Sequence, residues 1–276
     1  MGKRIFSTVL LWTIVGTSLW FFRTNGALAL VAIISVLTLR EFYQLMHASG
    51  YDPFDKVGMV FGGLITLGPW FHVQFGWPTH LFFPLAVIVF SVRLLGERTA
   101  ETRVETVATT LFGLAYVAVM LSYLVAIIAP RPGDTISPTG RLLLALWLVI
   151  VTKFCDMGAL LSGLTFGRHK MSPQISPKKT WEGAVGGVLF SMASGAAVAW
   201  FARAEFPSHL TPLVAAAIAI PIAIVGIVAD LVESVMKRRA NQKDSGASIP
   251  GIGGMFDLSD SIILVAPIGY FLFRLP

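Results

Sequence analysis

The sequence predicts an all-α fold, a polytopic integral membrane bundle of about nine transmembrane helices. Residues of the set AVILMFWYC make up 55% of the 276 positions, and charged residues make up 13%, about half of the roughly 25% found in soluble domains. The mean hydropathy is +0.75. A folded soluble domain of this size still exposes about a quarter of its unfolded surface, so it could not hide this much apolar surface. A soluble enzyme, a disordered chain and a disulfide-rich scaffold are therefore excluded, and the single Cys155 excludes an internal disulfide.

Nine apolar stretches approach the roughly 20 residues that a helix needs to cross the hydrocarbon layer. They are residues 5–22, 27–46, 57–71, 81–96, 104–129, 141–163, 183–202, 212–236 and 257–273. The stretches 57–71 and 81–96 are short, so we expect them to be tilted, partly buried, or joined as one re-entrant pair. The first stretch follows Lys3 and Arg4 as a signal peptide would. Its apolar run is longer than the usual stretch of roughly 7–15 residues, so we interpret it as the first span.

The placement of Lys and Arg predicts a cytoplasmic N-terminus and an outside C-terminus. Of the 21 Lys and Arg residues, Lys153 lies within a span and most of the others fall in inward loops. The outward loops hold Arg23, Arg131, Arg141, Arg203 and Arg274. The net charge of +6 could indicate nucleic acid, but this one-sided placement favours an anionic membrane surface and an anionic substrate. No nucleic-acid partner is expected.

An ionisable side chain inside a span costs about 2.5–3.5 kcal/mol on insertion scales, so each one is a functional candidate. A first group lies near the end of the span 141–163, where Lys153 and Asp156 are spaced i, i+3 and share a helix face. They form either a self-neutralising ion pair or a site in which Asp156 lies at the cytoplasmic mouth of a polar cavity. Arg168 and His169 follow in the next loop, and we expect His169 to be solvated.

A second group is the segment 176–183, Ser-Pro-Lys-Lys-Thr-Trp-Glu-Gly, directly before the span 183–202. Thr180 predicts a helix start at this point. Two lysines ahead of a helix N-terminus indicate a polyphosphate site, because the free N–H groups and the helix dipole there also favour anions. The alternative is that Lys178 and Lys179 only anchor the span on the cytoplasmic side, and the spacing does not decide between the two.

A third group lies on the last two spans. Polar residues fall at i, i+3, i+4 and i+7 on the first of them, and the pattern i, i+3, i+4 repeats on the second. These residues are Asp230, Glu233, Ser234 and Lys237, then Asp257, Asp260 and Ser261. Because the two spans form a helical hairpin, the stripes can meet, and four carboxylates in a low-dielectric site need a cation. Hard oxygen ligands favour Mg²⁺ or a similar ion; the alternative is a set of helix caps and interhelical hydrogen bonds.

The loop between these spans completes an ordered pattern. It reads Ser234-x-x-Lys237-Arg238, then Lys243-Asp244-x-Gly246, then Pro250-Gly251-Ile252-Gly253-Gly254-x-x-Asp257-Leu258-x-Asp260. This pattern resembles the C-terminal signature of the phosphatidate cytidylyltransferases, or CDP-diacylglycerol synthases, S-x-x-K-R-x4-K-D-x-[GSA] followed by P-G-H-G-G-x-x-D-R-x-D. The segment 176–183 matches the family's S-P-K-K-T-W-E-G in full, and Asp156 matches an aspartate before a small-residue turn. The resemblance covers about residues 140–273.

The resemblance implies transfer of CMP from CTP to phosphatidic acid, with the site facing the cytoplasm from the inner (plasma) membrane. It implies Asp230 and Asp257 as ligands of Mg²⁺ or a similar divalent cation, supported by Glu233 and Asp260, and a homodimer. Asp230, Asp257, Lys237 and Lys243 are the implied catalytic residues. The implied substrate-binding residues are Asp156, Arg168, Ser176, Lys178, Lys179, Thr180, Glu182, Ser234, Arg238, Asp244, Gly253 and Gly254. We expect residues 1–140 to form a lipid-facing, dimer-forming scaffold of transmembrane helices and residues 141–276 to form the catalytic region.

Two positions depart from the family pattern. Ile252 stands where the family usually has His, and Leu258 stands where it has Arg. These changes remove a proton donor and a fixed positive charge from beside the expected metal and phosphates. They keep open a CTP-dependent transferase or kinase that acts on another lipid, of the polyprenol or archaeol type. Two further alternatives are a catalytically silent scaffold and a cation-coupled transporter, which would predict related halves with paired broken helices.

Overall fold

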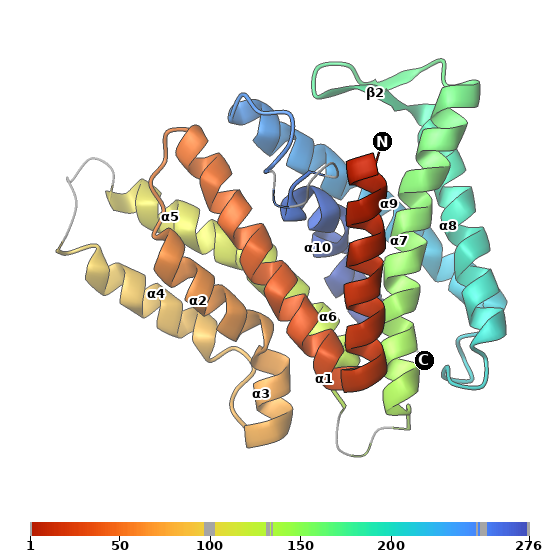
Figure 1. Cartoon of the computed structure of the whole chain (residues 1–276), viewed down its shortest axis with the longest axis horizontal. Helices are drawn as coiled ribbons and strands as arrows, with labels where there is room; N and C mark the ends of the chain where they lie inside the picture. The colour runs from red at the N-terminus through yellow and green to blue at the C-terminus, as the bar shows by residue number, and fades with distance from the viewer. Residues whose placement is uncertain are drawn as a thin grey trace. The chain divides into compact units, whose positions relative to one another are not determined.

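The computed structural model describes residues 2–96, 103–130, 133, 135–246, 248 and 253–274, apart from the side chains of residues 2–8, 11 and 12. Arg131, Pro250, Gly251 and Ile252, which the sequence analysis singled out, lie outside these ranges. The described chain is almost entirely helical and carries one short hairpin (Figure 1). Its elements are α1 (Gly2–Ala48), α2 (Asp55–Thr66), α3 (Gly68–Phe75), α4 (Phe82–Arg93), α5 (Arg103–Gly113), η1 (Leu114–Val119), α6 (Met120–Ile128), α7 (Pro138–Phe166), β1 (Lys170–Ser172), β2 (Ser176–Thr180), α8 (Trp181–Phe201), α9 (Pro212–Arg239) and α10 (Met255–Leu272).

Helices occupy all nine apolar stretches found in the sequence. Six of the described helical segments are long and apolar enough to cross a membrane, judged by length and composition, and α4 is a shorter apolar helix. The six are Thr13–Ala48, Arg103–Ile128, Pro138–Phe166, Trp181–Phe201, Pro212–Arg239 and Met255–Leu272. The protein is therefore a helical membrane protein, whereas nine spans and their orientation stay predictions. The short stretches 57–71 and 81–96 account for the difference, because α2 and α4 have 12 residues each.

Helix α1 consists of two arms that meet at Arg23, whose backbone leaves the helical region with φ 45° and ψ −123°. Figure 1 shows the arms as a red and an orange helix joined by a sharp bend. A side chain at Gly26 would collide with the backbone of Ser18, so glycine lets the second arm start directly beside the first. The break confirms the predicted division between the stretches 5–22 and 27–46.

The chain divides into two compact units, and the three boundaries between them fall after α6, inside α9 and inside α10. Unit 1 consists of Met1–Ala129 and Met236–Ser259. Unit 2 consists of Pro130–Val235 and Asp260–Pro276.

In unit 1 the second arm of α1 packs on α2, α5, η1 and α6. Leu39, Phe42 and Tyr43 form the buried face of this arm, and the spacing of these side chains is that of one helix stripe. The Tyr43 hydroxyl donates a hydrogen bond to the carbonyl of Thr110, and the Thr110 hydroxyl accepts one from the amide of Phe54. The core of unit 1 therefore holds the second arm of α1 in a fixed register.

In unit 2 the helices α7 and α8 run side by side (Figure 1). Small residues line the contact: Gly158 packs under the side chain of Phe190, and Gly186 packs against Ser162. At Gly187 an added Cβ would lie 2.8 Å from the carbonyl oxygen of Cys155. Such small residues let helix backbones approach closely in membranes, where dispersion and hydrogen bonding replace the hydrophobic driving force.

The hairpin of β1 and β2 is the part of the described fold that the all-α prediction missed. The two strands are antiparallel, with Lys170 opposite Thr180 and Ser172 opposite Ser176. Thr180 then caps α8, since its hydroxyl accepts a hydrogen bond of 3.1 Å from the amide of Gly183. The predicted helix start at Thr180 is confirmed, and the extended backbone of this cap continues the strand before it.

We expect Gly187→Val to destabilise the protein by roughly 1–3 kcal/mol, because backbone atoms of α7 leave no room for the side chain. Thermal unfolding in detergent measures the effect. Ala193→Val is the matched control, because it adds a branched side chain on the exposed face of the same helix, where we expect a change within about 0.5 kcal/mol. Equal unfolding midpoints for the two variants would contradict the close contact between α7 and α8.

Candidate functional site

Three carboxylates converge inside unit 2. Asp230 and Glu233 lie one turn apart on α9, and Asp260 lies in the first half of α10. One oxygen from each side chain lies within 4.8 Å of the others. Glu233 is 1% exposed and Asp260 is 6% exposed, so the group is largely shielded from water. The i, i+3 spacing on α9 and the meeting of α9 with α10 are both as the sequence predicts.

These three residues fit a hard divalent cation. Mg²⁺ binds oxygen ligands at about 2.1 Å, so oxygens on opposite sides of the ion lie about 4.2 Å apart. Small side-chain movements would bring one oxygen of each carboxylate to these distances. Like charges on Glu233 and Asp260, which are buried, and on the half-buried Asp230 repel one another in a low dielectric, and a divalent cation would remove that repulsion.

A lysine from the hairpin reaches this cluster. The Lys179 ammonium lies 2.6 Å from a carboxylate oxygen of Asp230, and both side chains are less than half exposed. Lys178 is exposed, as expected because successive side chains of a strand point to opposite faces. The strand β2 thus turns one lysine of the pair toward the acids and the other toward solvent.

Lys153 and Asp156 of α7 form an ion pair, with 3.4 Å between the ammonium and the carboxylate. A self-neutralising pair of these two residues was one of the two alternatives predicted from their spacing. Both side chains are more than a third exposed. The pair belongs to unit 2, as do Lys179 and the three clustered carboxylates.

The other residues of the second predicted group hold the hairpin to α8. The Glu182 carboxylate accepts hydrogen bonds from the backbone amides of Arg168 and His169, and it lies 2.6 Å from the His169 ring nitrogen Nδ1. The amide of Trp181 donates to the carbonyl of His169. His169 is exposed as predicted, but its ring is paired with Glu182. Ser176 begins β2, and Thr180 ends β2 and caps α8.

A second set of predicted site residues lies in unit 1, around Asp257. The Asp257 oxygen Oδ1 is 2.8 Å from the Lys237 ammonium. Its oxygen Oδ2 accepts hydrogen bonds from the amides of Ser245 and Gly254, at 3.0 and 2.9 Å. The bond from Gly254 is the reciprocal half of a capping box, in which an acid in the first turn binds the amide just before the helix. Asp257 therefore fixes the start of α10.

The remaining predicted residues of unit 1 differ in exposure. Arg238, Lys243 and Asp244 are exposed, and Gly254 is buried. Gly253 has φ 129°, a backbone conformation that side chains disfavour, so glycine is required there. In unit 2, Ser234 is half-buried on α9. Leu258, where the family has Arg, is half-buried in the first turn of α10.

Glu41 is a buried carboxylate beside Asp257 and its loop partners that was not predicted from the sequence. It is 1% exposed on the second arm of α1, and its carboxylate accepts hydrogen bonds from the hydroxyls of Ser245 and Ser248 and from the amide of Phe256. The sequence could have identified Glu41 as a candidate, because it is the sole carboxylate in the apolar stretch 27–46.

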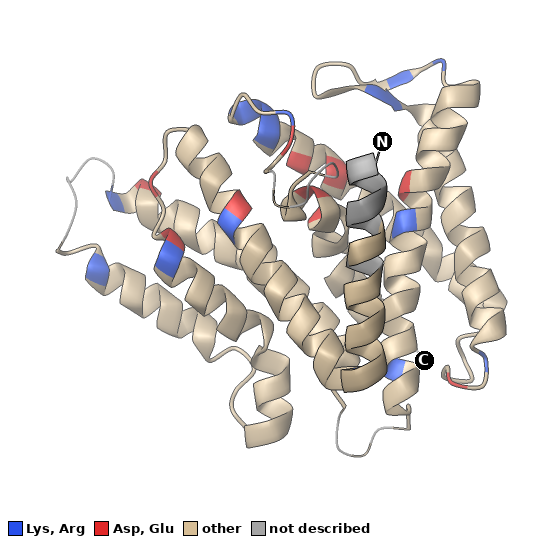
Figure 2. Cartoon of the chain, in the orientation of Figure 1, with Lys and Arg blue, Asp and Glu red and all other residues tan. Residues whose placement is uncertain are grey.

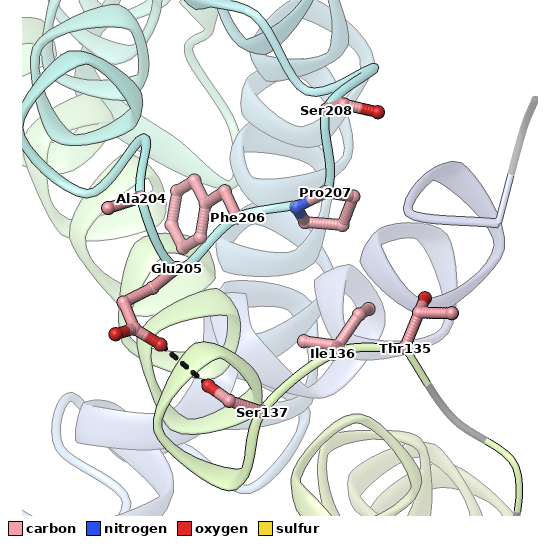
Figure 3. A pocket seen from close by; sticks show the side chains of 8 residues that line it. All are labelled: Thr135, Ile136, Ser137, Ala204, Glu205, Phe206, Pro207 and Ser208. Carbon is pink, nitrogen blue, oxygen red and sulfur yellow. Dashed lines mark hydrogen bonds between the residues drawn. The ribbon is translucent and has the colours of Figure 1, made fainter.

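A pocket of about 310 Å³ in unit 2 lies away from these residues. It is lined by residues 135–137, just before α7, and by residues 204–208, just after α8 (Figure 3). The Ser137 hydroxyl donates a hydrogen bond of 2.6 Å to Glu205 across it. Asp156 lies about 27 Å further along α7, at 1.5 Å per residue. The pocket contains none of the predicted site residues.

Figure 2 shows the described charges by sign: the last turn of α9 is basic, the first half of α10 is acidic, and the hairpin is basic. The residues behind this pattern are Lys237, Arg238 and Arg239 on α9, Asp257 and Asp260 on α10, and Lys170, Lys178 and Lys179 on the hairpin. The last turn of α9 and the hairpin therefore carry positive charge, and the first half of α10 carries negative charge (Figure 2).

Similarity to known proteins shows the family to which this chain belongs. The model of the cytidylyltransferase family matches residues 2–275, so the similarity extends through the N-terminal half, beyond the range 140–273. A phosphatidate cytidylyltransferase of Synechocystis sp. is 32% identical over 274 residues, covering 91% of this chain and 88% of that protein. Those of Thermotoga maritima and Staphylococcus aureus are 29% and 28% identical and cover 90% and 88% of this chain. With a match over nearly its whole length, the chain belongs to the cytidylyltransferase family.

Proposed function

We infer that the protein is an enzyme, a nucleotidyltransferase that transfers CMP from CTP to phosphatidic acid and releases CDP-diacylglycerol and pyrophosphate in phospholipid biosynthesis. Membership of the cytidylyltransferase family over residues 2–275 carries this conclusion. The names of the relatives, phosphatidate cytidylyltransferase, supply the acceptor. Family membership also argues against the transporter and silent-scaffold alternatives.

In this reaction a phosphate oxygen of phosphatidic acid attacks the α-phosphorus of CTP. The bond from that phosphorus to the oxygen bridging to the β-phosphate breaks, and pyrophosphate leaves with the electron pair. The attacking phosphate is already ionised, so no strong general base is needed. Charge neutralisation and in-line positioning are what the protein must provide.

We propose that Asp230, Glu233 and Asp260 hold Mg²⁺ or a similar divalent cation, with Asp257 as the further ligand that the family resemblance implies. The bound ion would act as a Lewis acid on the phosphate oxygens. The convergence of three oxygens within 4.8 Å supports this assignment. Lys179, beside Asp230, would then bind the phosphates together with the metal.

We propose that further basic residues neutralise the triphosphate and the phosphatidate headgroup. They are Lys178, Lys237, Arg238 and Lys243. Lys237 and Lys243 would act as catalytic residues in the sense that they contact the reacting phosphates. Asp156, Arg168, Ser176, Thr180, Glu182, Ser234, Asp244, Gly253 and Gly254 complete the proposed binding site, where the observed contacts of Thr180, Glu182 and Gly254 support a role in shaping the backbone around the substrates.

The proposed membrane arrangement is nine spans with a cytoplasmic N-terminus and an outside C-terminus, in the inner (plasma) membrane. The one-sided placement of Lys and Arg supports it. CTP would arrive from the cytosol, and the acyl chains of phosphatidic acid would enter from the inner leaflet. A homodimer, with residues 1–140 as its scaffold and residues 141–276 as the catalytic region, completes the proposal.

Purified protein in detergent, given labelled CTP, Mg²⁺ and phosphatidic acid, should form labelled CDP-diacylglycerol and pyrophosphate. Polyprenol and archaeol-type acceptors are tested in parallel, because Leu258 and Ile252 depart from the family pattern. Folded protein that labels one of those acceptors but not phosphatidic acid would show that the acceptor is another lipid. Folded protein that labels none of them contradicts the proposed function.

We expect Asp230→Asn and Asp260→Asn to reduce turnover at least about 100-fold, because each removes a negative ligand from the proposed metal. Calorimetry should show weaker Mg²⁺ binding for both variants. Glu105→Gln, at an exposed carboxylate of α5, is the control and should behave as wild type. If Mg²⁺ binding and turnover survive in both Asn variants, the metal assignment is wrong.

A further inference from the structure

We propose that Glu41 is a positioning residue, which fixes the described ends of the loop between α9 and α10, residues 245–246 and 254, and through them the direction of the Asp257 carboxylate. The proposal rests on the proposed function, in which Asp257 and Lys237 belong to the catalytic machinery. All the contacts that carry it lie within unit 1.

The first observation is where the hydrogen bonds of Glu41 go. A carboxylate that is 1% exposed is costly unless donors replace the lost water. The Glu41 oxygen Oε2 accepts from the amide of Phe256 at 2.8 Å and from the hydroxyl of Ser245 at 3.2 Å, and Oε1 accepts from the hydroxyl of Ser248. Bonds to an ionised acceptor are the stronger kind. All three donors belong to the α9–α10 loop or the first turn of α10.

The second observation is that Ser245 joins the two carboxylates. Its hydroxyl donates to Glu41 and accepts a hydrogen bond of 3.1 Å from the amide of Asp257. Its own amide donates to the Asp257 oxygen Oδ2 at 3.0 Å. The other oxygen, Oδ1, is left directed at Lys237, at 2.8 Å. Displacement of Ser245 would therefore remove one of the two amides that hold Oδ2, so that Gly254 alone would hold this oxygen.

The third observation is that the loop backbone lies directly on the Glu41 side chain. Added Cβ atoms at Gly246 and at Gly254 would both collide with the Glu41 carboxyl group. Glycine at these two positions lets the chain pass on either side of the carboxylate. Both glycines fall in the motif segments quoted in the sequence analysis, so their small size has a structural reason in this chain.

Neighbouring residues of α1 pack on α10 in a different way. The Thr38 hydroxyl lies 2.8 Å from that of Ser259, and Phe42 meets Phe256 edge to face at 6.2 Å between ring centroids. These contacts attach α10 to α1 without involving the loop. Glu41 is thus the residue of this helix face that binds the loop, and its loss should affect loop and catalysis more than helix packing.

The test compares Glu41→Gln with Ser35→Ala. Glutamine has the shape of glutamate but lacks the charge and the second acceptor oxygen. Ser35 is also buried on α1 and bonds Thr66 of α2 at 2.7 Å, so Ser35→Ala removes a buried hydrogen bond that does not involve the loop. Hydrogen–deuterium exchange of the full-length protein in detergent, without metal or substrate, is followed for peptides that cover residues 241–258 and 103–128.

We expect Glu41→Gln to speed exchange in residues 241–258 while residues 103–128 exchange as in wild type. At a temperature where both variants are folded, its kcat should fall at least about tenfold, because small displacements of catalytic groups have large effects on rate. Ser35→Ala should change neither the loop exchange nor kcat. Ser245→Ala should reproduce the effect of Glu41→Gln, and the double variant should lose little more than either single one.

The outcomes below separate the positioning role of Glu41 from the proposed function of the protein. Unchanged loop exchange, or a kcat for Glu41→Gln within about twofold of an active wild type, overturns the positioning role. Additive losses in the double variant also overturn it, because they would show that Ser245 does not act with Glu41. If Glu41→Gln does not fold, Ser245→Ala alone gives the decision by the same two measurements. If Glu41→Gln speeds loop exchange but the wild type makes no CDP-diacylglycerol, the contact between Glu41 and the loop is supported and the proposed function is contradicted.

Discussion

Carboxylates buried in apolar helices are the constraint on which the rest of the structure depends. Each needs a source of positive charge or hydrogen-bond donors, because an isolated buried charge is prohibitively costly. Three solutions occur in the described chain. Glu41 uses an amide and two hydroxyls, Asp257 uses Lys237 and two amides, and Asp230 uses Lys179 within a cluster that suits a cation. These requirements account for the positions of Ser245 and Gly254 beside the first two carboxylates and of Lys179 beside Asp230.

The hairpin illustrates how a small element serves a helical protein. A helix at residues 176–180 would spread Lys178 and Lys179 about 100° apart around its axis, whereas the strand sends them to opposite faces. Lys179 can then reach Asp230 while Lys178 stays in solvent. The Glu182 carboxylate secures the base of the hairpin through backbone amides, so the position of Lys179 does not depend on a free loop.

Local features of the fold were predictable from the sequence, and long-range ones were not. The apolar stretches located the long helices and the break near Arg23, and the residue type at Thr180 predicted the cap of α8, because these features depend on neighbouring residues. The stretch 57–71 was predicted as one segment and contains two helices, α2 and α3. The spacing of Asp230, Glu233 and Asp260 anticipated the acidic cluster. The partners of Glu41 are 204 to 215 positions away in the sequence, and no local pattern joins them. The hairpin was missed because its register depends on contacts with α8, and the lengths of α2 and α4 left the number of spans undecided.

The long separation between Glu41 and its partners also matters during synthesis of the protein. At roughly 5–20 residues per second, about 10–40 s pass between the emergence of Glu41 and that of Ser245 from the ribosome. During this interval the second arm of α1 carries a carboxylate without its native donors. Only a chain translated as far as α10 can bury that charge at low cost. A truncated product would keep a polar defect in an otherwise apolar helix, a feature by which membrane quality control could distinguish it from the finished enzyme.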